Sequence, residues 1–445
     1  MKSTPEKIAL WFIAIQLTLV LAALCFFFPA PESSDDLTLF NPVYMVLHYG
    51  KMTYPAHGYF NNMIVHPPVH YLSIAMLMKC GFNSFYAISF PPFLFGMLII
   101  FLVMTSRFEP IIKAGLIFPL MALIMFDVSS IRPDCTLALA WYAGLISLES
   151  ARNDNWDTKK LVLGGMLLTY ASALHYYACF AFTGALVYIF LAWKNFNRNE
   201  ALKKTAAISG IGVLAGLCFL LIFIIPNYHE IMKAVSDNQG DGSISEAVAK
   251  HFKTYRQLAG NWFAVDDKYF HISALMYPAW NNIIPLMLLG SSLLLFQPSL
   301  REMAVASLPL TLFIFLGSRG KSFGYYLPET LIYLSGITIT MLSLIQWLAA
   351  KFVSEKAKRY SLFALILSPI SLYPILVMAG IYSNPKLRER EMHLARACTK
   401  QITGNNALVS GRISAWYIGG GARWYDVSRD IIWKDRRYIK HDKRH

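Results

Sequence analysis

The sequence predicts an all-α integral membrane protein that crosses the bilayer many times. Of its 445 residues, 56% are hydrophobic and only 15% are charged, and the mean hydropathy is +0.44. A soluble protein needs more charge to cover its surface, and its apolar residues follow interrupted, amphipathic patterns. In this chain they form repeated runs close to the roughly 20 residues that a helix needs to cross a membrane.

Hydropathy predicts about eleven membrane-spanning helices. The predicted spans are 8–29, 85–105, 111–126, 132–149, 161–174, 176–193, 205–226, 275–297, 303–317, 327–348 and 360–382. The first apolar run follows Lys2 and Lys7, as in a signal peptide. It is longer than the roughly 7–15 apolar residues of a signal-peptide core, so we expect it to be retained as the first helix.

The basic residues predict the side of the membrane on which each connecting segment lies, because cytoplasmic loops are enriched in Lys and Arg. With a cytoplasmic N-terminus, six segments on that side carry Lys2 and Lys7; Arg107 and Lys113; Arg152, Lys159 and Lys160; Lys194, Arg198, Lys203 and Lys204; Arg301; and Lys351, Lys356, Lys358 and Arg359. The opposite short loops carry far fewer. An odd number of spans then places the C-terminal tail outside, in a multi-pass protein of a bacterial inner or plasma membrane.

This distribution explains the net charge of +14 without a nucleic-acid partner, which we do not expect. Basic segments at a membrane surface instead attract the anionic headgroups of membrane lipids or lipid-linked phosphates. The six cysteines show no CxxC pair and no spacing typical of a metal site. We expect most of them to be small buried hydrophobic residues.

The chain is expected to consist of a transmembrane domain, 1–382, and a basic C-terminal tail, 383–445. Two outside segments of the domain, 30–84 and 227–274, are too long to be simple turns. In the tail, 406–410 (NALVS) is typical of a short buried strand and precedes a glycine-rich turn. The tail is therefore predicted to be a small α/β extension outside the membrane.

The second outer loop contains an amphipathic pattern. Ser243 and Glu246 have the spacing of a capping box. Apolar residues then recur at helical spacing between basic ones: Val248, Phe252, Tyr255, Ala259 and Trp262. This pattern predicts either a juxtamembrane helix lying in the outer membrane interface or an ordinary amphipathic helix packed on its neighbours.

Asp35 and Asp36 lie just beyond the first predicted helix, on the outer side. Transfer of a sugar to a hydroxyl needs a carboxylate that takes up the acceptor proton as the leaving phosphate departs. The pair is a candidate for this general base, although adjacent carboxylates at a membrane surface are mostly solvated loop residues. Cationic side chains can neutralise the phosphate, so this chemistry does not require a metal cofactor.

Further polar side chains lie at the same predicted face. The segment from His66 to Tyr71 (HPPVHY) contains two prolines, which predict an extended entry into a helix. Because His66 precedes that helix, we do not expect it to form a metal pair with His70.

Arg132, beside Asp134, begins one later span, and His175 interrupts another. Three more candidates share a short outer loop: Arg319, Lys321 and Tyr325. Ionisable residues near the hydrocarbon are often functional, and Arg and Lys suit a phosphate anion. Ion pairs, helix caps and interfacial tyrosine belts are the alternative explanations.

The order of these motifs resembles the GT-C superfamily, specifically the branch of protein O-mannosyltransferases and aminoarabinose transferases. In that branch the first helix is followed by an Asp-Glu pair and a tyrosine-containing short helix. A basic-Pro-Pro-Leu-aromatic motif then leads into an amphipathic helix that ends near Phe-Gly. An Arg-Pro-Asp and a basic-Tyr-Tyr-Leu-Pro element follow. The matching elements here are Asp35-Asp36, Tyr44, His66–Tyr71, Lys79–Phe82, Arg132–Asp134 and Lys321–Pro328. The resemblance covers most of residues 1–330.

The resemblance implies a monosaccharide donor linked to undecaprenyl or dolichyl phosphate, used outside the cytoplasm in a single inverting displacement. Asp35 matches the catalytic aspartate and would be the base, while Asp36 stands where Glu is usual. His66 occupies a position often held by a Lys that contacts the donor phosphate, and Arg132 and Lys321 would be phosphate or structural contacts. The acceptor would be a hydroxyl of a protein, a lipid or a glycan.

The remaining residues of the predicted donor site are His70, Tyr71, His175, Arg319 and Tyr325. Two other classes of protein compete with the enzyme. A flippase or transporter of lipid-linked sugars would show polar residues at mid-membrane and related halves, and neither is evident. A non-catalytic scaffold has no use for the acidic and His-Pro-Pro motifs. Another GT-C enzyme, of oligosaccharyltransferase or arabinofuranosyl type, is a nearer alternative.

Overall fold

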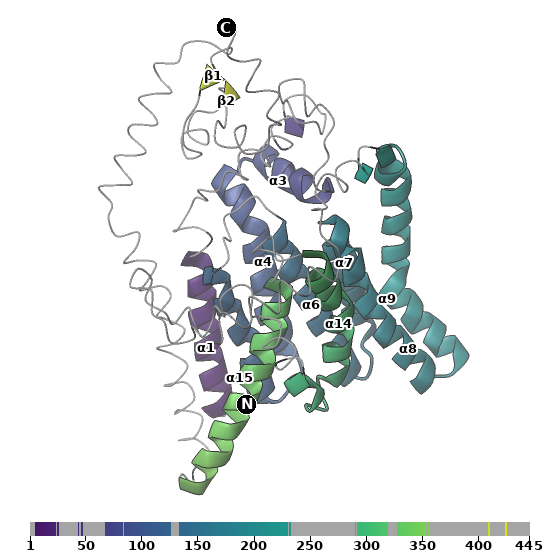
Figure 1. The fold of residues 1–445 in the computed structure, drawn as a ribbon. Coiled ribbons are helices and arrows are strands. Elements are labelled where there is room, and N and C mark those ends of the chain that lie inside the picture. The colour runs from purple at the N-terminus through teal and green to yellow at the C-terminus, as the bar shows by residue number, and fades with distance from the viewer. Residues whose placement is uncertain are drawn as a thin grey trace.

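The computed structural model describes residues 5–23, 25, 43, 46–47, 67–82, 84–125, 133–229, 231–232, 290, 292–318, 327–352, 355, 408–409 and 423–424. They form a bundle of helices, shown in Figure 1. In chain order the helices are α1 (Pro5–Ala22), α3 (Val69–Lys79), α4 (Ser84–Thr105), α5 (Pro110–Ile117), η2 (Phe118–Met125), α6 (Asp134–Asn153), α7 (Thr158–Ser172), η3 (Tyr176–Gly184), α8 (Ala185–Asn195), α9 (Arg198–Phe219), η4 (Leu220–Ile224), α14 (Arg301–Ser318) and α15 (Leu327–Phe352).

These helices agree with the hydropathy prediction. Apart from 275–297 and 360–382, which lie mostly or wholly outside the described residues, every predicted span overlaps a helix. Within the described residues, three helices are long and apolar enough to cross a membrane alone: Tyr86–Thr105, Arg198–Ile224 and Thr330–Lys351. The chain is therefore an integral membrane protein, while the total of about eleven spans stays a prediction.

Prolines explain where α5 begins and where the α-helix of α5 changes into the 3-10 helix η2. Pro110 is the first residue of α5, a position at which its missing N–H is not needed. Pro119 lies one residue into η2, where the α-helix of α5 gives way to a 3-10 helix. A proline there cannot donate the backbone bond that an α-helix would use. The predicted span 111–126 is thus half α-helix and half 3-10 helix.

Helix α6 is the centre of the bundle. Its side chains are buried without interruption from Asp134 to Ala151, and α4, α7, α14 and α15 pack around it. In its middle the Tyr142 hydroxyl donates to the Leu116 carbonyl oxygen at 2.9 Å and lies 2.6 Å from Ser335 Oγ. These contacts link α6 to α5 and α15, and they satisfy a hydroxyl that would be costly to bury alone.

Helix α7 approaches its neighbours through adjacent glycines. A Cβ added to Gly164 would lie 2.6 Å from the side chain of Leu148 in α6. A Cβ added to Gly165 would collide with the backbone of Ile208 in α9. Small residues allow membrane helices to pack this closely, so α7 is held between α6 and α9 at a separation that depends on glycine.

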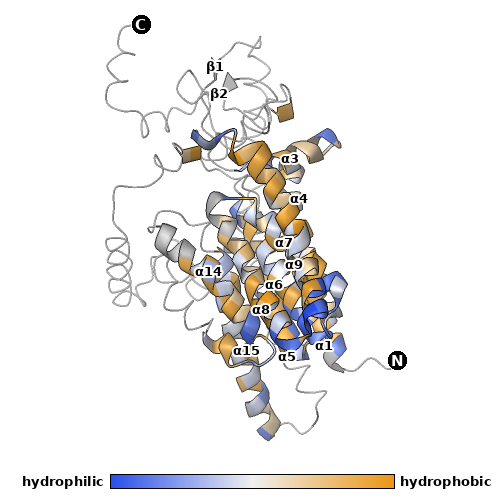
Figure 2. Cartoon of the chain, turned by 90° about the vertical axis from the view of Figure 1, so that its right-hand side faces the viewer, coloured by the Kyte–Doolittle hydropathy of each residue, from blue (hydrophilic) through white to orange (hydrophobic). Residues whose placement is uncertain are grey.

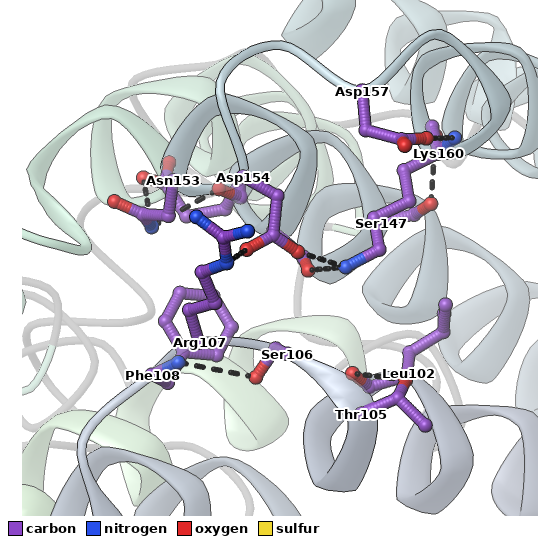
Figure 3. Close-up of polar contacts among 12 residues, drawn as sticks. Leu102, Thr105, Ser106, Arg107, Phe108, Ser147, Asn153, Asp154, Asp157 and Lys160 are labelled. Atoms are coloured by element: carbon purple, nitrogen blue, oxygen red, sulfur yellow. Dashed lines mark hydrogen bonds and ion pairs between the residues drawn. The ribbon is translucent and has the colours of Figure 1, made fainter.

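Charged contacts join several connecting segments at one end of the bundle (Figure 3). Arg107, between α4 and α5, pairs with Asp154 at 3.1 Å, and Asp154 also pairs with Lys160 at the start of α7. Lys204 of α9 donates to the carbonyl oxygen of Trp156 at 2.8 Å. The basic residues predicted these segments to share one side of the membrane, and the contacts bring them together. We call this the Asp154 end; its cytoplasmic orientation stays a prediction.

A buried ion-pair cluster attaches α14 at the same end. The Glu149 side chain is completely buried and accepts from Arg152 Nε at 2.7 Å and from the Tyr188 hydroxyl of α8 at 2.8 Å. Arg152 also pairs with Glu302 of α14 at 3.1 Å. The cluster therefore ties α6, α8 and α14 together with polar groups that satisfy one another.

Two short strands are described in the C-terminal tail. β1 (Leu408–Val409) lies within the predicted strand 406–410 and pairs in parallel with β2 (Arg423–Trp424). The glycine-rich turn and the amphipathic pattern at 243–262 lie outside the described residues. The α/β extension and the interfacial helix therefore stay predictions.

Candidate functional site

The candidate site is built around α3, which lies at the opposite end of the bundle from the chain's N-terminus (Figure 1). We call this the α3 end. Colouring by hydropathy shows apolar residues along the long helices, a large group of hydrophilic residues near α1 and α5, and a smaller number beside α3 (Figure 2). Two of the motifs predicted for the outer face, His66–Tyr71 and Lys79–Phe82, adjoin or include residues of α3. The outer orientation of this end stays a prediction.

The start of α3 follows the prediction from the two prolines. Pro67 and Pro68 are both buried, and the helix begins at Val69. The first backbone bond runs from the Leu72 N–H to the Pro68 carbonyl oxygen at 2.9 Å. A proline at a helix start loses no bond, because the first N–H groups of a helix have no partner within it. Pro67 and Pro68 thus lead directly into α3.

The end of α3 is equally well defined. The N–H groups of Gly81 and Phe82 donate to the carbonyl oxygens of Met78 and Leu77, at 3.0 and 3.2 Å. This is the bonding pattern of a Schellman motif, and Gly81 supplies its left-handed residue with φ +97°. The Phe82 ring then contacts Phe90 of α4 at 5.3 Å. The helix thus ends near Gly81-Phe82, as the motif order predicted.

One side of α3 packs on α4 through a small apolar cluster. Tyr71, Ile74 and Ala75 of α3 contact Ala87 and Ile88 of α4 in this cluster, which also contains Val43 from the first outer loop. Tyr71 is only 1% exposed. Its ring is therefore part of the packing that attaches α3 to the bundle.

His70 is also buried, with 1% of its surface exposed. Its ring makes an edge-to-face contact with the ring of Tyr71 at 5.7 Å between centroids. A buried imidazole can hold a proton donor or acceptor in a fixed direction, which suits recognition of a phosphate or sugar hydroxyl as well as a structural role.

A second side of α3 meets α7. Ser73 Oγ lies 3.5 Å from the hydroxyl of Tyr170, near the end of α7. The Tyr170 ring contacts the ring of Phe95 in α4 at 5.3 Å. Tyr170 and Ser73 were not predicted as site residues. A tyrosine inside an apolar run is an ordinary core residue in sequence, and only the fold shows that its hydroxyl reaches α3.

His175 lies in the turn between α7 and η3, where the sequence predicted an interruption, and it is 9% exposed. Asp134 is the first residue of α6 and is 4% exposed. Because α6 and α7 pack together and are joined by a short turn at 154–157, the start of α6 at Asp134 lies at the same end of the bundle as Tyr170 and His175, the end opposite Asp154. Within the described ranges, no three His, Cys, Asp or Glu side chains come together as a metal site would require.

The other predicted site residues lie outside the described residues. They are Asp35, Asp36, His66, Arg132, Arg319, Lys321 and Tyr325. Five of them adjoin described elements in the sequence: His66 precedes Pro67, Arg132 precedes Pro133, and Arg319, Lys321 and Tyr325 lie in the segment between α14 and α15.

Comparison with known proteins identifies the fold. No protein-family model matches the sequence, and no curated protein matches it. ArnT from Cupriavidus metallidurans, solved with undecaprenyl phosphate, is similar with a TM-score of 0.51 at 13% identity, over 95% of this chain and 86% of ArnT. The archaeal oligosaccharyltransferase AglB from Archaeoglobus fulgidus, solved with an inhibitory peptide and a dolichol-phosphate, is similar with a TM-score of 0.50 at 11% identity. That match covers 93% of this chain and 64% of AglB.

ArnT and AglB are both GT-C glycosyltransferases. The likeness extends over nearly the whole of this chain, so the chain has the GT-C fold. This fold is the one that the order of sequence motifs predicted.

Proposed function

We propose that the protein is a membrane glycosyltransferase that moves a monosaccharide from a polyprenyl-phosphate donor to a hydroxyl acceptor. The observation that carries this proposal is the GT-C fold over almost the full chain, shared with two enzymes whose structures contain undecaprenyl phosphate or dolichol-phosphate. The Pro-Pro motif at the start of α3 supports it, because the motif and the fold point to the same class of enzyme independently.

Asp35 is the proposed general base. It takes the proton from the acceptor hydroxyl while the hydroxyl oxygen bonds to the anomeric carbon of the sugar. The bond between that carbon and the phosphate oxygen breaks on the opposite face, so the configuration inverts and polyprenyl phosphate leaves. Asp36 supports the base as a second carboxylate. All atoms and charges balance without a further reactant.

The donor phosphate needs neutralisation as it leaves. We propose His66, Arg132 and Lys321 for this role, because each is basic and each adjoins a segment predicted at the α3 end. Positive side chains at that position stabilise the charge that develops on the leaving phosphate. Arg319 and Tyr325 share the loop of Lys321 and are proposed as further contacts to the donor phosphate and sugar.

The buried residues His70, Tyr71 and His175 have other roles in the proposal. His70 and His175 are proposed donor contacts, with imidazole N–H groups suited to a phosphate or sugar oxygen. Tyr71 is proposed mainly as the anchor of α3, because its ring lies in the apolar cluster with α4. The reaction is proposed to occur outside the cytoplasm, with a protein, lipid or glycan as acceptor.

The decisive experiment is transfer from a labelled donor. The purified protein in detergent receives radiolabelled polyprenyl-phosphate sugars and a membrane extract as the source of acceptors. Wild-type protein should move label from lipid to an acceptor or to water, and Asp35→Asn should abolish transfer while the protein stays folded. Glu109→Gln is the matched control, because Glu109 is an exposed carboxylate before α5 at the Asp154 end.

Other results of this experiment would favour a different function. Donor binding without transfer across the panel, unaffected by Asp35→Asn, would favour a flippase or transporter of lipid-linked sugars. Neither binding nor transfer would favour a scaffold. Transfer that depends on an added divalent metal would favour a GT-C enzyme of the oligosaccharyltransferase type.

A further inference from the structure

We infer that Tyr170 is a positioning residue that fixes α3, and thereby the chain entering it at His66, against the bundle. The inference rests on the proposed function, because the segment that α3 anchors carries the proposed base and phosphate contacts. Tyr170 itself lies in α7 and is assigned no contact with the donor.

The other hydrogen bond of Ser73 identifies which hydroxyl is the donor in the contact with Tyr170. Ser73 Oγ donates its single hydrogen to the Val69 carbonyl oxygen at 2.8 Å, within α3. A serine hydroxyl has one hydrogen and two lone pairs, so towards Tyr170 it acts as acceptor. The Tyr170 hydroxyl, 3.5 Å away, is therefore the donor. The bond is long, but both side chains are partly buried, where competition from water is reduced.

Tyr170 is itself held in place by a third helix. Its ring contacts Phe95 of α4 at 5.3 Å between centroids, and aromatic pairs at this separation attract one another. The ring is thus braced on α4 while the hydroxyl reaches Ser73. One side chain of α7 therefore contacts both α3, which follows Pro67 and Pro68, and α4, on which α3 packs.

The contact lies in the first half of α3, the half that adjoins the proposed phosphate contact His66 in the sequence. The apolar packing of Tyr71 and Ile74 on α4 holds α3 to the bundle but has little directional preference, as is general for apolar contacts. A hydrogen bond in the first half of α3 fixes the rotation and axial position of the helix. Pro67 and Pro68, which are both buried, lie directly before α3, and the proposed phosphate contact His66 adjoins them in the sequence.

Positioning of this kind should affect the rate more than donor affinity. A displacement of about 1 Å in a reacting group can lower a rate as much as 10²-fold. For loss of one hydrogen bond we expect Tyr170→Phe to lower kcat roughly three- to tenfold, with KM for the donor unchanged. Phenylalanine keeps the ring contact with Phe95, so the variant should fold as the wild type does.

The position of α3 can be followed without any enzyme assay. Cys80 is exposed at the C-terminal end of α3, so a spin label attached there reports the motion of the helix. The other cysteines are replaced by alanine or serine in the parent protein. Tyr170→Phe and Ser73→Ala should each increase the mobility of the label, and the double variant should add nothing further.

Ser172→Ala is the matched control, because Ser172 lies in α7 and its hydroxyl bonds to the Leu168 carbonyl oxygen of the same helix. It should change neither label mobility nor kcat. Unchanged mobility in Tyr170→Phe would overturn the inference, as would increased mobility with wild-type kcat. Absence of transfer by the wild type would instead defeat the proposed function, while the label would still report whether Tyr170 holds α3.

Discussion

Replacing Gly165 by alanine tests the packing of α7 most directly. The Cβ of the new residue would lie 2.8 Å from the carbonyl carbon of Ile208 in α9 and closer still to its oxygen. Ordinary contacts of a Cβ begin at 3.4 Å, so the carbonyl carbon alone would require the two helices to separate by about 0.6 Å (3.4 − 2.8), and the closer oxygen requires more. The obstacle is backbone, which cannot rotate away as a flexible side chain can.

The magnitude follows from the packing lost. A gap of about 0.5–1 Å removes a quarter to a half of the dispersion energy of the atoms that face it. Overpacked cores are typically destabilised by about 1–3 kcal/mol. Alanine is also a better helix former than glycine by about 1 kcal/mol, and this gain works against the clash.

A matched substitution separates the two effects. Gly210 lies in α9, is exposed and has no atom within 4 Å of an added Cβ. Gly210→Ala carries the same gain in helix propensity without a clash, so it should be neutral or stabilising. The difference between the two variants in free energy of unfolding should then equal the clash, about 1–3 kcal/mol in favour of Gly210→Ala.

Unfolding in mixed detergent and sodium dodecyl sulfate micelles, followed by circular dichroism, measures this difference. Equal midpoints for Gly165→Ala and Gly210→Ala would refute the close approach of α7 to α9. A lower midpoint for Gly210→Ala than for Gly165→Ala would also refute it, because that result would mean that Gly210, and not Gly165, lies against a neighbouring helix.

Three other substitutions test separate contacts by the same unfolding measurement. Arg152→Met should lower the free energy of unfolding by about 3–5 kcal/mol, because it leaves the buried Glu149 carboxylate without its cation. Adding Glu149→Leu should recover much of this loss. No recovery in the double variant would argue against a buried ion pair. Tyr142→Phe should destabilise by about 1 kcal/mol through loss of its hydrogen bonds, whereas an unchanged midpoint would contradict the link from α6 to α5 and α15. Gly81→Ala should destabilise by about 1–2 kcal/mol from its positive φ alone, since nothing lies near the added Cβ; a neutral result would mean that α3 does not end in the left-handed conformation.

Much of the fold was predictable from hydropathy, because burial in a bilayer imposes long apolar runs. The run at 85–105 corresponds to α4 at Ser84–Thr105 almost residue for residue. The predicted span 176–193 was less accurate, because it is a 3-10 helix to Gly184 followed by α8. At that junction a Cβ on Gly184 would lie 2.6 Å from the Ala306 carbonyl oxygen of α14. Such a close approach depends on the partner helix, which local sequence does not identify.

The part of the candidate site that could be predicted is the extent of α3, because residues next to each end of this helix restrict the backbone. Two prolines and Gly81 predicted where α3 starts and stops, since both residue types restrict the backbone directly. Tyr170 was not predictable, because nothing in its own segment indicates that its hydroxyl reaches Ser73 from far along the sequence. The assignment of Asp35 as base stays a prediction from the motif order.

Helix α6 overlaps the predicted span 132–149, so a newly synthesised chain is expected to place it in the membrane before the helices that surround it are all present. Its sequence runs from Asp134 to Asn153 and includes Glu149 and Arg152, charges that the insertion machinery releases into lipid only reluctantly. Helix α4, which is far more apolar, precedes it, and α7 follows after a short turn. We therefore expect α6 to leave the translocon together with these neighbours, so that biogenesis of the bundle proceeds by groups of helices rather than one span at a time.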